Sequence, residues 1–432
     1  MSAQCRAVAA RVLAATLAEG QSLSQNLPPA LDQVKPKDRA LLQQLCYGTL
    51  RSYHRMQGVM QQLLEKPLKS KDADIQSLLL CGAYQLLEMR TPDHAALSSS
   101  VDACRLLKKN WATGLVNGVL RRCARERDKL LQALGDAQAA SHPDWLYQLI
   151  RQHWPQQCEQ IFLANNQPPP MTLRINQRRV ETRSYIAELA EQGIEAAPGG
   201  MVDGAVRLSR PVDVEQLPGF AQGRVSVQDE AAQLAAGLLA PEPGDRVLDA
   251  CSAPGGKSCH LLELQPAISQ LVAMDRESTR LQRVAENMKR LGLEANLLQG
   301  DACAPATVLD DALFDRILVD APCSGTGVIR RHPDIKLLRR ASDIASLAAT
   351  QLELLQALWP LLKPGGILLY VTCSILPEEN AEVLRAFLEQ SADAVCETLE
   401  ETWGLDCSPG RQVLPNQDGA DGLYFARLLK QA

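Results

Sequence analysis

The chain has 432 residues, of which 46% are apolar and 22% are charged, the usage of a folded rather than a disordered protein. Its length corresponds to roughly three domains. No apolar run is long enough for a membrane helix, and the 13 cysteines include no C-x-x-C pair, which argues against a zinc finger or a disulfide framework. Composition therefore indicates a soluble protein of several domains, expected in the reducing cytoplasm, with neither a membrane partner nor a metal.

The formal charge of −5 is unevenly distributed along the chain. Residues 1–150 contain 19 Lys and Arg against 13 Asp and Glu, a charge of +6, and the remaining residues carry −11. A basic segment on an acidic protein indicates an acidic partner such as nucleic acid. A solvated helical surface explains the same charge equally well, so both interpretations stay open on charge alone.

Residues 1–140 are expected to form an all-α bundle. Apolar residues recur at spacings of three and four in 40–50, 75–89 and 115–122, and no strand-like alternation interrupts them. Residues 1–18 contain two arginines and no acid, as targeting peptides do. The helical spacing of their apolar residues favours a first bundle helix instead.

A proline-rich break at 167–170 cannot continue a helix and marks a boundary after the bundle. Residues 145–235 are expected to form a small α+β connector module. Its predicted elements are strands at 171–176, 206–208 and 225–227 and a helix at 185–192.

From residue 236 to 432 apolar strands alternate with helices, the pattern of an α/β domain with a parallel, doubly wound sheet. The expected strands are 246–250, 271–274, 296–298, 316–319 and 367–371, with helices at 278–291 and 343–362. Ligands of such sheets bind beyond the carboxyl ends of the strands. The residues at those ends are therefore the candidate site.

The first three strand ends suggest a nucleotide-like cofactor. The first strand runs into a loop in which Gly255 and Gly256 allow a tight turn before a helix begins. The second ends at Asp275, where an acid typically reaches ribose hydroxyls from a solvent-facing loop, and the third ends at Asp301. Neither G-x-G-x-x-G nor a P-loop is present. An adenosine-bearing cofactor without a triphosphate fits this pattern best.

The fourth and fifth strand ends carry cysteines, Cys323 in the sequence Asp320-Ala-Pro-Cys and Cys373 in Thr-Cys-Ser. Loops at strand ends are usually exposed and carry function, so a mere packing role is the weaker interpretation of both. Thiolates are strong nucleophiles near neutral pH. A thiolate that adds to carbon 6 of a pyrimidine makes carbon 5 able to attack a methyl sulfonium, and a base must then remove the carbon 5 proton.

These motifs resemble those of the S-adenosylmethionine-dependent RNA cytosine-5 methyltransferases. The resemblance rests on residues 247–257, 320–325 and 372–374, and residues 422–428 match the last strand of that family. Residues 1–140 resemble the RNA-binding helical domain of the antitermination factor NusB, through 39–51 and 116–122. Ser252 and Ser258 replace the usual Ala and Thr, both small changes.

The resemblance implies a Rossmann-like methyltransferase sheet preceded by a NusB-like bundle and the connector, and 16S ribosomal RNA as substrate. It implies Cys373 as the nucleophile, Cys323 as the residue that assists product release, and Asp320 as the group that holds ring nitrogen 3 and the amino edge of cytosine. DNA cytosine-5 methyltransferases use the fourth-strand cysteine as nucleophile instead. The residues implied to bind S-adenosylmethionine are Cys251, Ser252, Ala253, Pro254, Gly255, Gly256, Lys257, Asp275, Asp301 and Asp320.

Two other functions compete with this hypothesis. A non-catalytic RNA-binding or antitermination factor with an idle sheet domain is disfavoured by the presence of Asp320, Cys323 and Cys373 together. A methyltransferase that modifies tRNA is disfavoured by the NusB-like domain. A monomer is expected, and the substrate is naked RNA or a partly assembled small subunit.

Overall fold

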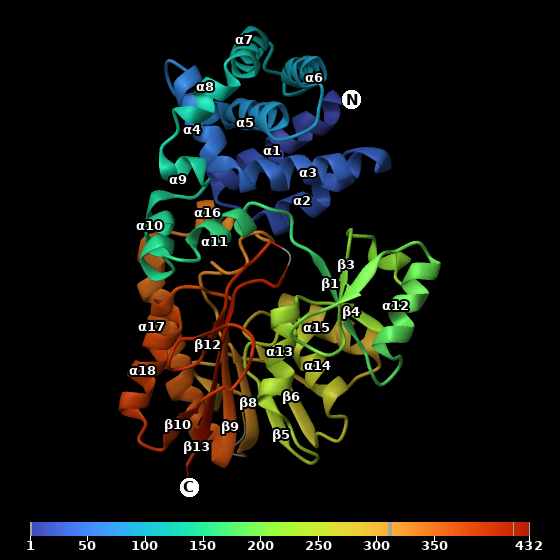
Figure 1. Ribbon diagram of the computed structural model, residues 1–432, viewed down its shortest axis with the longest axis vertical. Helices are drawn as coiled ribbons and strands as arrows, with labels where there is room; N and C mark the ends of the chain where they lie inside the picture. Colours follow the sequence, from blue (N-terminus) through green and yellow to red (C-terminus); the bar gives the residue numbers. More distant parts are fainter. Residues whose placement is uncertain (1, 310–312, 418, 432) are drawn as a thin grey trace. The chain divides into compact units, whose positions relative to one another are not determined.

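The computed structural model describes residues 2–309, 313–417 and 419–431, which fold as two compact units (Figure 1). The helical unit comprises Met1–Pro168 together with Ile329–Ala341, and the sheet unit comprises Pro169–Val328 and Ser342–Ala432. Across the described ranges, no helix combines the length and the hydropathy that crossing a membrane requires.

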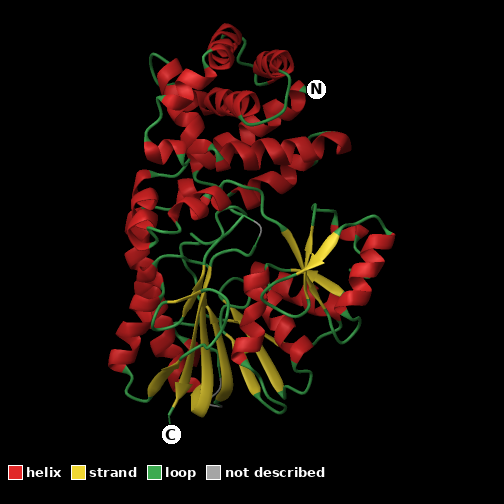
Figure 2. Cartoon of the chain, viewed as in Figure 1, coloured by secondary structure: helices red, strands yellow, loops and turns green. Residues whose placement is uncertain are grey.

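The described residues of the helical unit form helices and short 3-10 turns without strands, so the predicted all-α bundle is confirmed (Figure 2). Its first helix begins after Ser2, whose side chain accepts a hydrogen bond from the amide of Cys5, and ends at Gly20 in the left-handed conformation. This segment is a bundle helix, as its spacing predicted. The helices are α1 (Ala3–Glu19), α2 (Leu23–Leu31), α3 (Arg39–Arg51), α4 (Tyr53–Leu63), α5 (Ala73–Leu87), α6 (Asp93–Leu106), α7 (Ala112–Arg125), α8 (Arg127–Gln132), α9 (Asp136–Ala139), α10 (Asp144–His153), α11 (Cys158–Asn165) and α16 (Ile335–Leu338).

The segment Ile329–Ala341 belongs to the helical unit although it comes after a strand of the sheet unit in the chain. Lys336 is 1% exposed, and its Nζ donates to the carbonyl oxygens of Ser141 (2.7 Å) and Arg51. The Arg51 guanidinium in turn donates to the carbonyl oxygen of Arg330 from Nε (3.1 Å) and Nη2 (2.9 Å). Burial lowers the pKa of Lys336. These buried bonds integrate the segment into the bundle.

The connector of the sheet unit is a four-stranded antiparallel sheet in the order β2-β3-β1-β4, with helix α12 (Thr182–Glu191) beside it. Leu173 of the inner strand β1 lies opposite Val206 of β3 and Val227 of β4. The predicted small α+β module is therefore confirmed, with one additional edge strand. The strands are β1 (Met171–Ile175), β2 (Ala196–Pro198), β3 (Ala205–Leu208) and β4 (Val225–Val227).

The main sheet has the order β11-β12-β13-β9-β8-β5-β6-β7, with β10 paired to β13. The strands β9, β8, β5, β6 and β7 are parallel, as predicted, but β13 runs antiparallel to β9. The strands β10 to β13 extend the predicted parallel sheet by an antiparallel edge, of which only the last strand, at 422–428, was expected from the family resemblance. The strands are β5 (Arg246–Asp249), β6 (Gln270–Asp275), β7 (Asn296–Gln299), β8 (Phe314–Asp320), β9 (Leu362–Thr372), β10 (Ala394–Glu397), β11 (Leu405–Asp406), β12 (Arg411–Val413) and β13 (Leu423–Lys430).

Helices cover both faces of this sheet, which is the doubly wound arrangement. Alternation along β5 sends Val247 into the core with α13 (Glu230–Leu239), α14 (Gly256–Leu264) and α15 (Ser278–Leu291). Leu248 points into the opposite core with α17 (Ala341–Leu358) and α18 (Ala381–Gln390). The predicted helix 343–362 ends early, since a 3-10 turn containing Pro360 comes after α17 and β9 begins at Leu362.

Candidate active site

The loop after β5 forms a cradle at the carboxyl end of the sheet. Gly255 has φ +95°, and a Cβ there would lie 3.0 Å from Cγ1 of Val284, so no other residue fits without strain. Among the described residues, Ser252 Oγ and Asp249 Oδ1 are buried without a hydrogen-bond partner. Unpaired buried polar atoms beside the N-terminus of α14 fit a polar ligand.

Asp249, the last residue of β5, was not selected from the sequence as a site residue. It is 1% exposed, and Ser258 Oγ donates to its Oδ2 at 2.5 Å. Burial raises the pKa of Asp249 to about 7, with a smaller contribution from the charge of Asp320. A strand-end acid in a run of apolar residues was the only sequence signal for it.

Asp275 lies at the end of β6, beside the same loop. It was expected to face solvent, but its side chain is buried. Its side chain is 3% exposed, and it accepts hydrogen bonds from the amides of Ala253 (3.2 Å) and Glu277 (3.1 Å). The carboxylate thus stabilises the loop after β5, which was predicted to bind the cofactor together with Asp275. Since a carboxylate has about four acceptor positions, it can also accept from ribose hydroxyls.

The remaining predicted cofactor residues lie around this loop. Asp301 is half exposed and accepts a hydrogen bond from the amide of Cys303 at 3.0 Å. Burial raises the pKa of Cys251, and the charges of Asp320, Asp249 and Asp275 raise it further. Two predicted acids, Asp275 and Asp320, and the unpredicted Asp249 therefore lie near enough to this thiol for their charges to raise its pKa.

Lys257, in the first turn of α14, forms an ion pair with Asp320 at the end of β8, with Nζ 2.6 Å from Oδ2. Burial alone lowers the pKa of Lys257, but the charge and hydrogen bond of Asp320 outweigh it, and the pKa is raised. The Asp320 side chain remains 30% exposed. Its carboxylate is therefore held in place and still accessible to a ligand.

Cys323 and Cys373 lie together, with their Sγ atoms 3.2 Å apart. The expectation that both are exposed is wrong for Cys323, which is buried, whereas Cys373 is half-buried. The contact with Cys373, burial and the charge of Glu379 all raise the pKa of Cys323. Cys323 therefore holds its proton more firmly than an ordinary thiol does.

The backbone around the two cysteines is closely packed. Gly327 donates from its amide to the carbonyl oxygen of Cys373 (2.9 Å), and its carbonyl accepts from the amide of Gly422 (2.8 Å). A Cβ on Gly327 would lie 2.0 Å from the oxygen of Gly422, so glycine is required. Three segments meet here, from the ends of β8 and β9 and from the start of β13.

Within the ranges that the structure describes, no group of three or more His, Cys, Asp or Glu side chains is arranged to hold a metal ion. The expected absence of a metal stays a prediction.

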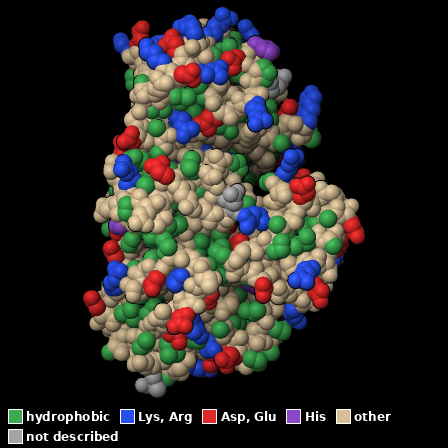
Figure 3. Space-filling model, viewed as in Figure 1, with side chains coloured by type: hydrophobic (Ala, Val, Ile, Leu, Met, Phe, Trp, Pro, Cys, Tyr) green, Lys and Arg blue, Asp and Glu red, His purple; other side chains and the backbone are tan. Residues whose placement is uncertain are grey.

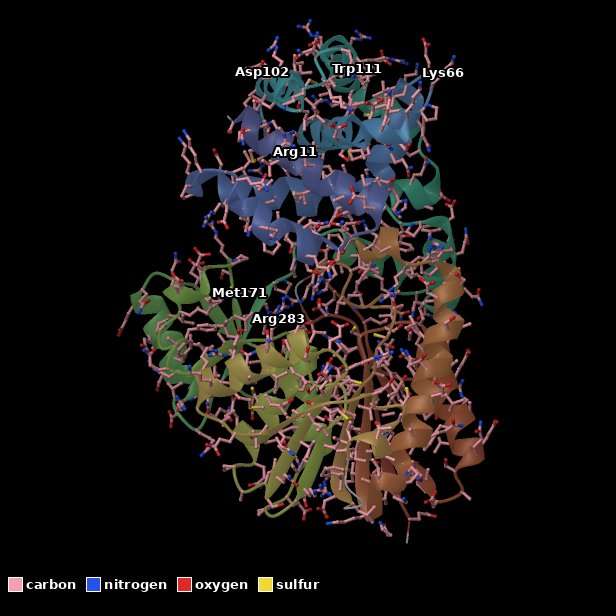
Figure 4. The ribbon with its side chains drawn as sticks, turned by 180° about the vertical axis from the view of Figure 1, so that it is seen from behind. Arg11, Lys66, Asp102, Trp111, Met171 and Arg283 are labelled. Carbon is pink, nitrogen blue, oxygen red and sulfur yellow. The ribbon has the colours of Figure 1, made fainter. Side chains whose placement is uncertain are left out.

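The helical unit has many Lys and Arg side chains on the face drawn in Figure 3, with acidic side chains among them. Arg11, Lys66 and Trp111, labelled in Figure 4, belong to this unit, and Trp111 is 56% exposed. Some of the cations are paired locally, such as Arg125 with Glu126 at 2.7 Å. Charge and one exposed aromatic ring are compatible with RNA, and the RNA-binding role of this unit stays a prediction.

A doubly wound sheet with a glycine turn after its first strand and acids at the next strand ends has the fold of a Rossmann-like methyltransferase. The comparisons with known proteins agree. Three family models match: the NusB family over residues 3–125, the RsmF/B-like ferredoxin-like domain over 142–215, and the 16S rRNA methyltransferase RsmB/F over 236–429.

The ribosomal RNA small subunit methyltransferase B of Pseudomonas putida is 51% identical over 99% of this chain and 98% of its own length. The chain therefore belongs to the 16S rRNA methyltransferase RsmB/F family. The crystal structure of PH0851 covers the whole chain and is itself wholly covered, with a TM-score of 0.83 at 23% identity, which shows a common fold. A methyltransferase homologue from Pyrococcus horikoshii covers 71% of this chain and 98% of its own, with a TM-score of 0.60 at 26% identity.

Proposed function

We propose that this protein transfers a methyl group from S-adenosylmethionine to carbon 5 of one cytosine of 16S ribosomal RNA, through a transient bond between Cys373 and carbon 6. The observation that carries the proposal is the pair of thiols 3.2 Å apart, on neighbouring strand ends, near the ion pair of Lys257 with Asp320. A methyltransferase that acts on an exposed heteroatom needs no thiols. Attack on a pyrimidine carbon does.

The cofactor site of this proposal is the loop 251–257 together with Asp275, Asp301 and Asp320. The unpaired Ser252 Oγ and the tight turn at Gly255 fit a bound nucleoside. When bound, S-adenosylmethionine supplies a methyl group on a positively charged sulfur. Asp275 accepts hydrogen bonds from ribose hydroxyls, in addition to the two amides that it already caps.

The protein groups act in sequence on the cytosine. Asp320, fixed by Lys257, holds ring nitrogen 3 and the amino edge, which orients carbon 6 toward Cys373. The thiolate of Cys373 adds to carbon 6 while the Lys257–Asp320 pair supplies a proton to ring nitrogen 3. Carbon 5 then takes the methyl group, whose bond to the positively charged sulfur would break to leave a neutral thioether. Loss of the carbon 5 proton to a base restores the double bond and expels Cys373. Cys323, whose Sγ lies 3.2 Å from that of Cys373, assists this release.

The two cysteines have separable phenotypes under this mechanism. Cys373→Ala should lower methylation to background and form no covalent adduct. Cys323→Ala should permit attack and methyl transfer but slow the release, so a protein–RNA band that survives denaturing electrophoresis should accumulate when S-adenosylmethionine is present. The adduct should form best on a loop or bulge, because a paired cytosine must first be swung out at a cost of a few kcal/mol.

Cys396→Ala is the matched control, since this half-buried cysteine lies on β10, outside the site, and should leave both readouts unchanged. Accumulation of the adduct in Cys373→Ala would reverse the two roles. Full activity in both site variants would refute covalent catalysis. Bisulfite sequencing of RNA from a deletion strain identifies the substrate, and loss of a tRNA signal instead of a 16S signal would contradict the proposed substrate. The monomeric state, the cytoplasmic location and the choice between naked RNA and a partly assembled subunit remain predictions.

A further inference from the structure

A carboxylate lies fully buried next to the two cysteines and has no role in the mechanism above. Glu379 ends a 3-10 turn, Pro377–Glu379, and is 0% exposed. Burying a carboxylate is costly unless hydrogen bonds replace its water. Its partners therefore indicate what the protein gains from burying it.

The hydrogen bonds of Glu379 join the two cysteine loops. Its Oε1 accepts from the amide of Ser324 at 2.7 Å, and its Oε2 accepts from the hydroxyls of Ser324 at 2.5 Å and Ser374 at 2.6 Å. Ser324 comes directly after Cys323, and Ser374 comes directly after Cys373. A single side chain thus binds the residues adjacent to both thiols.

A second layer of neutral groups holds Glu379 in place. Gln351 Nε2 donates to Oε1 of Glu379 (3.3 Å) and to the carbonyl oxygen of Pro322 (2.9 Å), the residue before Cys323. The hydroxyl of Tyr370, on β9, donates to the main-chain oxygen of Glu379 at 2.7 Å. The carboxylate is thus fixed to α17 and to both cysteine loops, and the main chain of Glu379 is fixed to β9. Glu379 is therefore held rigidly between the two loops.

We propose that Glu379 is a positioning residue that sets the separation of Cys323 and Cys373, and that product release depends on this separation. Only the effect of Glu379 on product release rests on the proposed function. The geometric part, the juxtaposition of the two thiols, is testable without RNA or cofactor.

Two substitutions separate length from charge. Glu379→Asp keeps the charge but shortens the side chain by one methylene, ~1.5 Å, so it cannot reach both loops at once. Glu379→Gln keeps the length, and the serine hydroxyls can accept from its amide while the Ser324 amide still donates to its oxygen. If Glu379 acts by positioning the two thiols, Glu379→Gln should preserve their separation and the rate of product release, and Glu379→Asp should preserve neither.

The first measurement is the rate at which diamide links Cys323 to Cys373, with mass spectrometry of the linked peptides. In this reaction the two thiols lose two electrons and two protons to diamide and form one disulfide. Thiols 3.2 Å apart should link readily in the wild-type protein. Linking should be at least ~10-fold slower in Glu379→Asp, and in Glu379→Gln it should be no slower than in the wild type, because loss of the charge that raises the pKa of Cys323 favours its thiolate.

The second measurement is steady-state methylation of 16S RNA. Because a misplacement of about 1 Å costs on the order of 100-fold in rate, Glu379→Asp should lose about that much in kcat. Its KM for S-adenosylmethionine should stay within about threefold, since Glu379 contacts none of the predicted cofactor residues in the described structure. Glu379→Gln should retain kcat within about tenfold of the wild type.

Glu230→Gln is the matched control, because Glu230 is also a buried acid and accepts a hydrogen bond from the amide of Met201 (2.6 Å), away from the cysteines. It should change neither the linking rate nor kcat. Unchanged linking in a folded Glu379→Asp protein overturns the inference. If that variant does not fold, Ser374→Ala replaces it, since it removes the bond from the Cys373 loop to Glu379 together with the contacts of Ser374 to Ser324 and Thr326, and unchanged linking there has the same meaning. Absence of methylation by the wild-type protein would refute the proposed function and leave the linking result intact.

Discussion

Replacing Asp249 by asparagine should stabilise the sheet unit at neutral and alkaline pH. The carboxyl is 1% exposed, and burial raises its pKa from 3.8 to about 7. Between these two values the native state holds a proton that the unfolded state has lost. The contribution of Asp249 to the free energy of unfolding therefore falls as the pH rises from about 4 to 7, and it stays constant above the pKa that Asp249 has in the folded protein. Asparagine keeps an acceptor for Ser258 and removes the charge, so the variant should lack this fall.

The size of the effect comes from the shift. At 1.36 kcal/mol per pKa unit, the shift from 3.8 to about 7 amounts to about 4 kcal/mol at pH 8 and to under half of that at pH 5. The free energy of unfolding is measured in urea without S-adenosylmethionine. The amount by which Asp249→Asn exceeds the wild type should be about 3 kcal/mol larger at pH 8 than at pH 5. A variant less stable than the wild type at pH 8, or a difference independent of pH, would refute the reasoning.

Two further predictions concern the cofactor loop and the helical unit. Asp275→Ala should weaken S-adenosylmethionine binding, measured by calorimetry, by about 10- to 100-fold, because hydrogen bonds to a charged group contribute roughly 1.5–3 kcal/mol. It should also lower the melting temperature, since the amides of Ala253 and Glu277 lose their acceptor. An unchanged affinity for S-adenosylmethionine would contradict the role of Asp275 in cofactor binding. Deleting residues 1–140 should weaken RNA binding and reduce its salt slope by roughly 0.7–0.9 per lost phosphate contact. The same deletion should make 329–341 sensitive to limited proteolysis, because Arg51 binds Arg330 and Lys336, and resistance there would show that the segment folds without the bundle.

Much of the fold could be predicted from periodicity in the sequence. Val247 and Leu248 pack into opposite cores, and burial on both faces gives a parallel strand its continuous apolar run. The strand ends at Asp275, Asp301 and Asp320 could be located for the same reason. The short strands of the antiparallel edge could not be located, because a two-residue strand such as Leu405–Asp406 has no periodicity to detect.

The environment of the site residues was less predictable than their positions. Asp275 looks like a solvent-facing loop acid in sequence, yet it is buried because the loop after β5 folds over it. Glu379 lies in a polar stretch, Pro377–Glu379, that is typical of an exposed turn. Its burial depends on donors from Ser324, Ser374 and Gln351, which lie far apart in the chain and meet only in the folded protein.

The segment after Cys323 also has an environment that its sequence does not predict, because it belongs to the other unit of the chain. Arg330 is 0% exposed although arginine is usually a surface residue, and the structure assigns Ile329–Ala341 to the helical unit. Because Lys336 is buried against carbonyl oxygens rather than a carboxylate, its position depends on donating to all of them at once. The chain thus enters the helical unit six residues after Cys323 and leaves it at α17. The bundle is consequently part of the framework of the methyltransferase chain, and a role confined to capturing RNA does not account for these bonds.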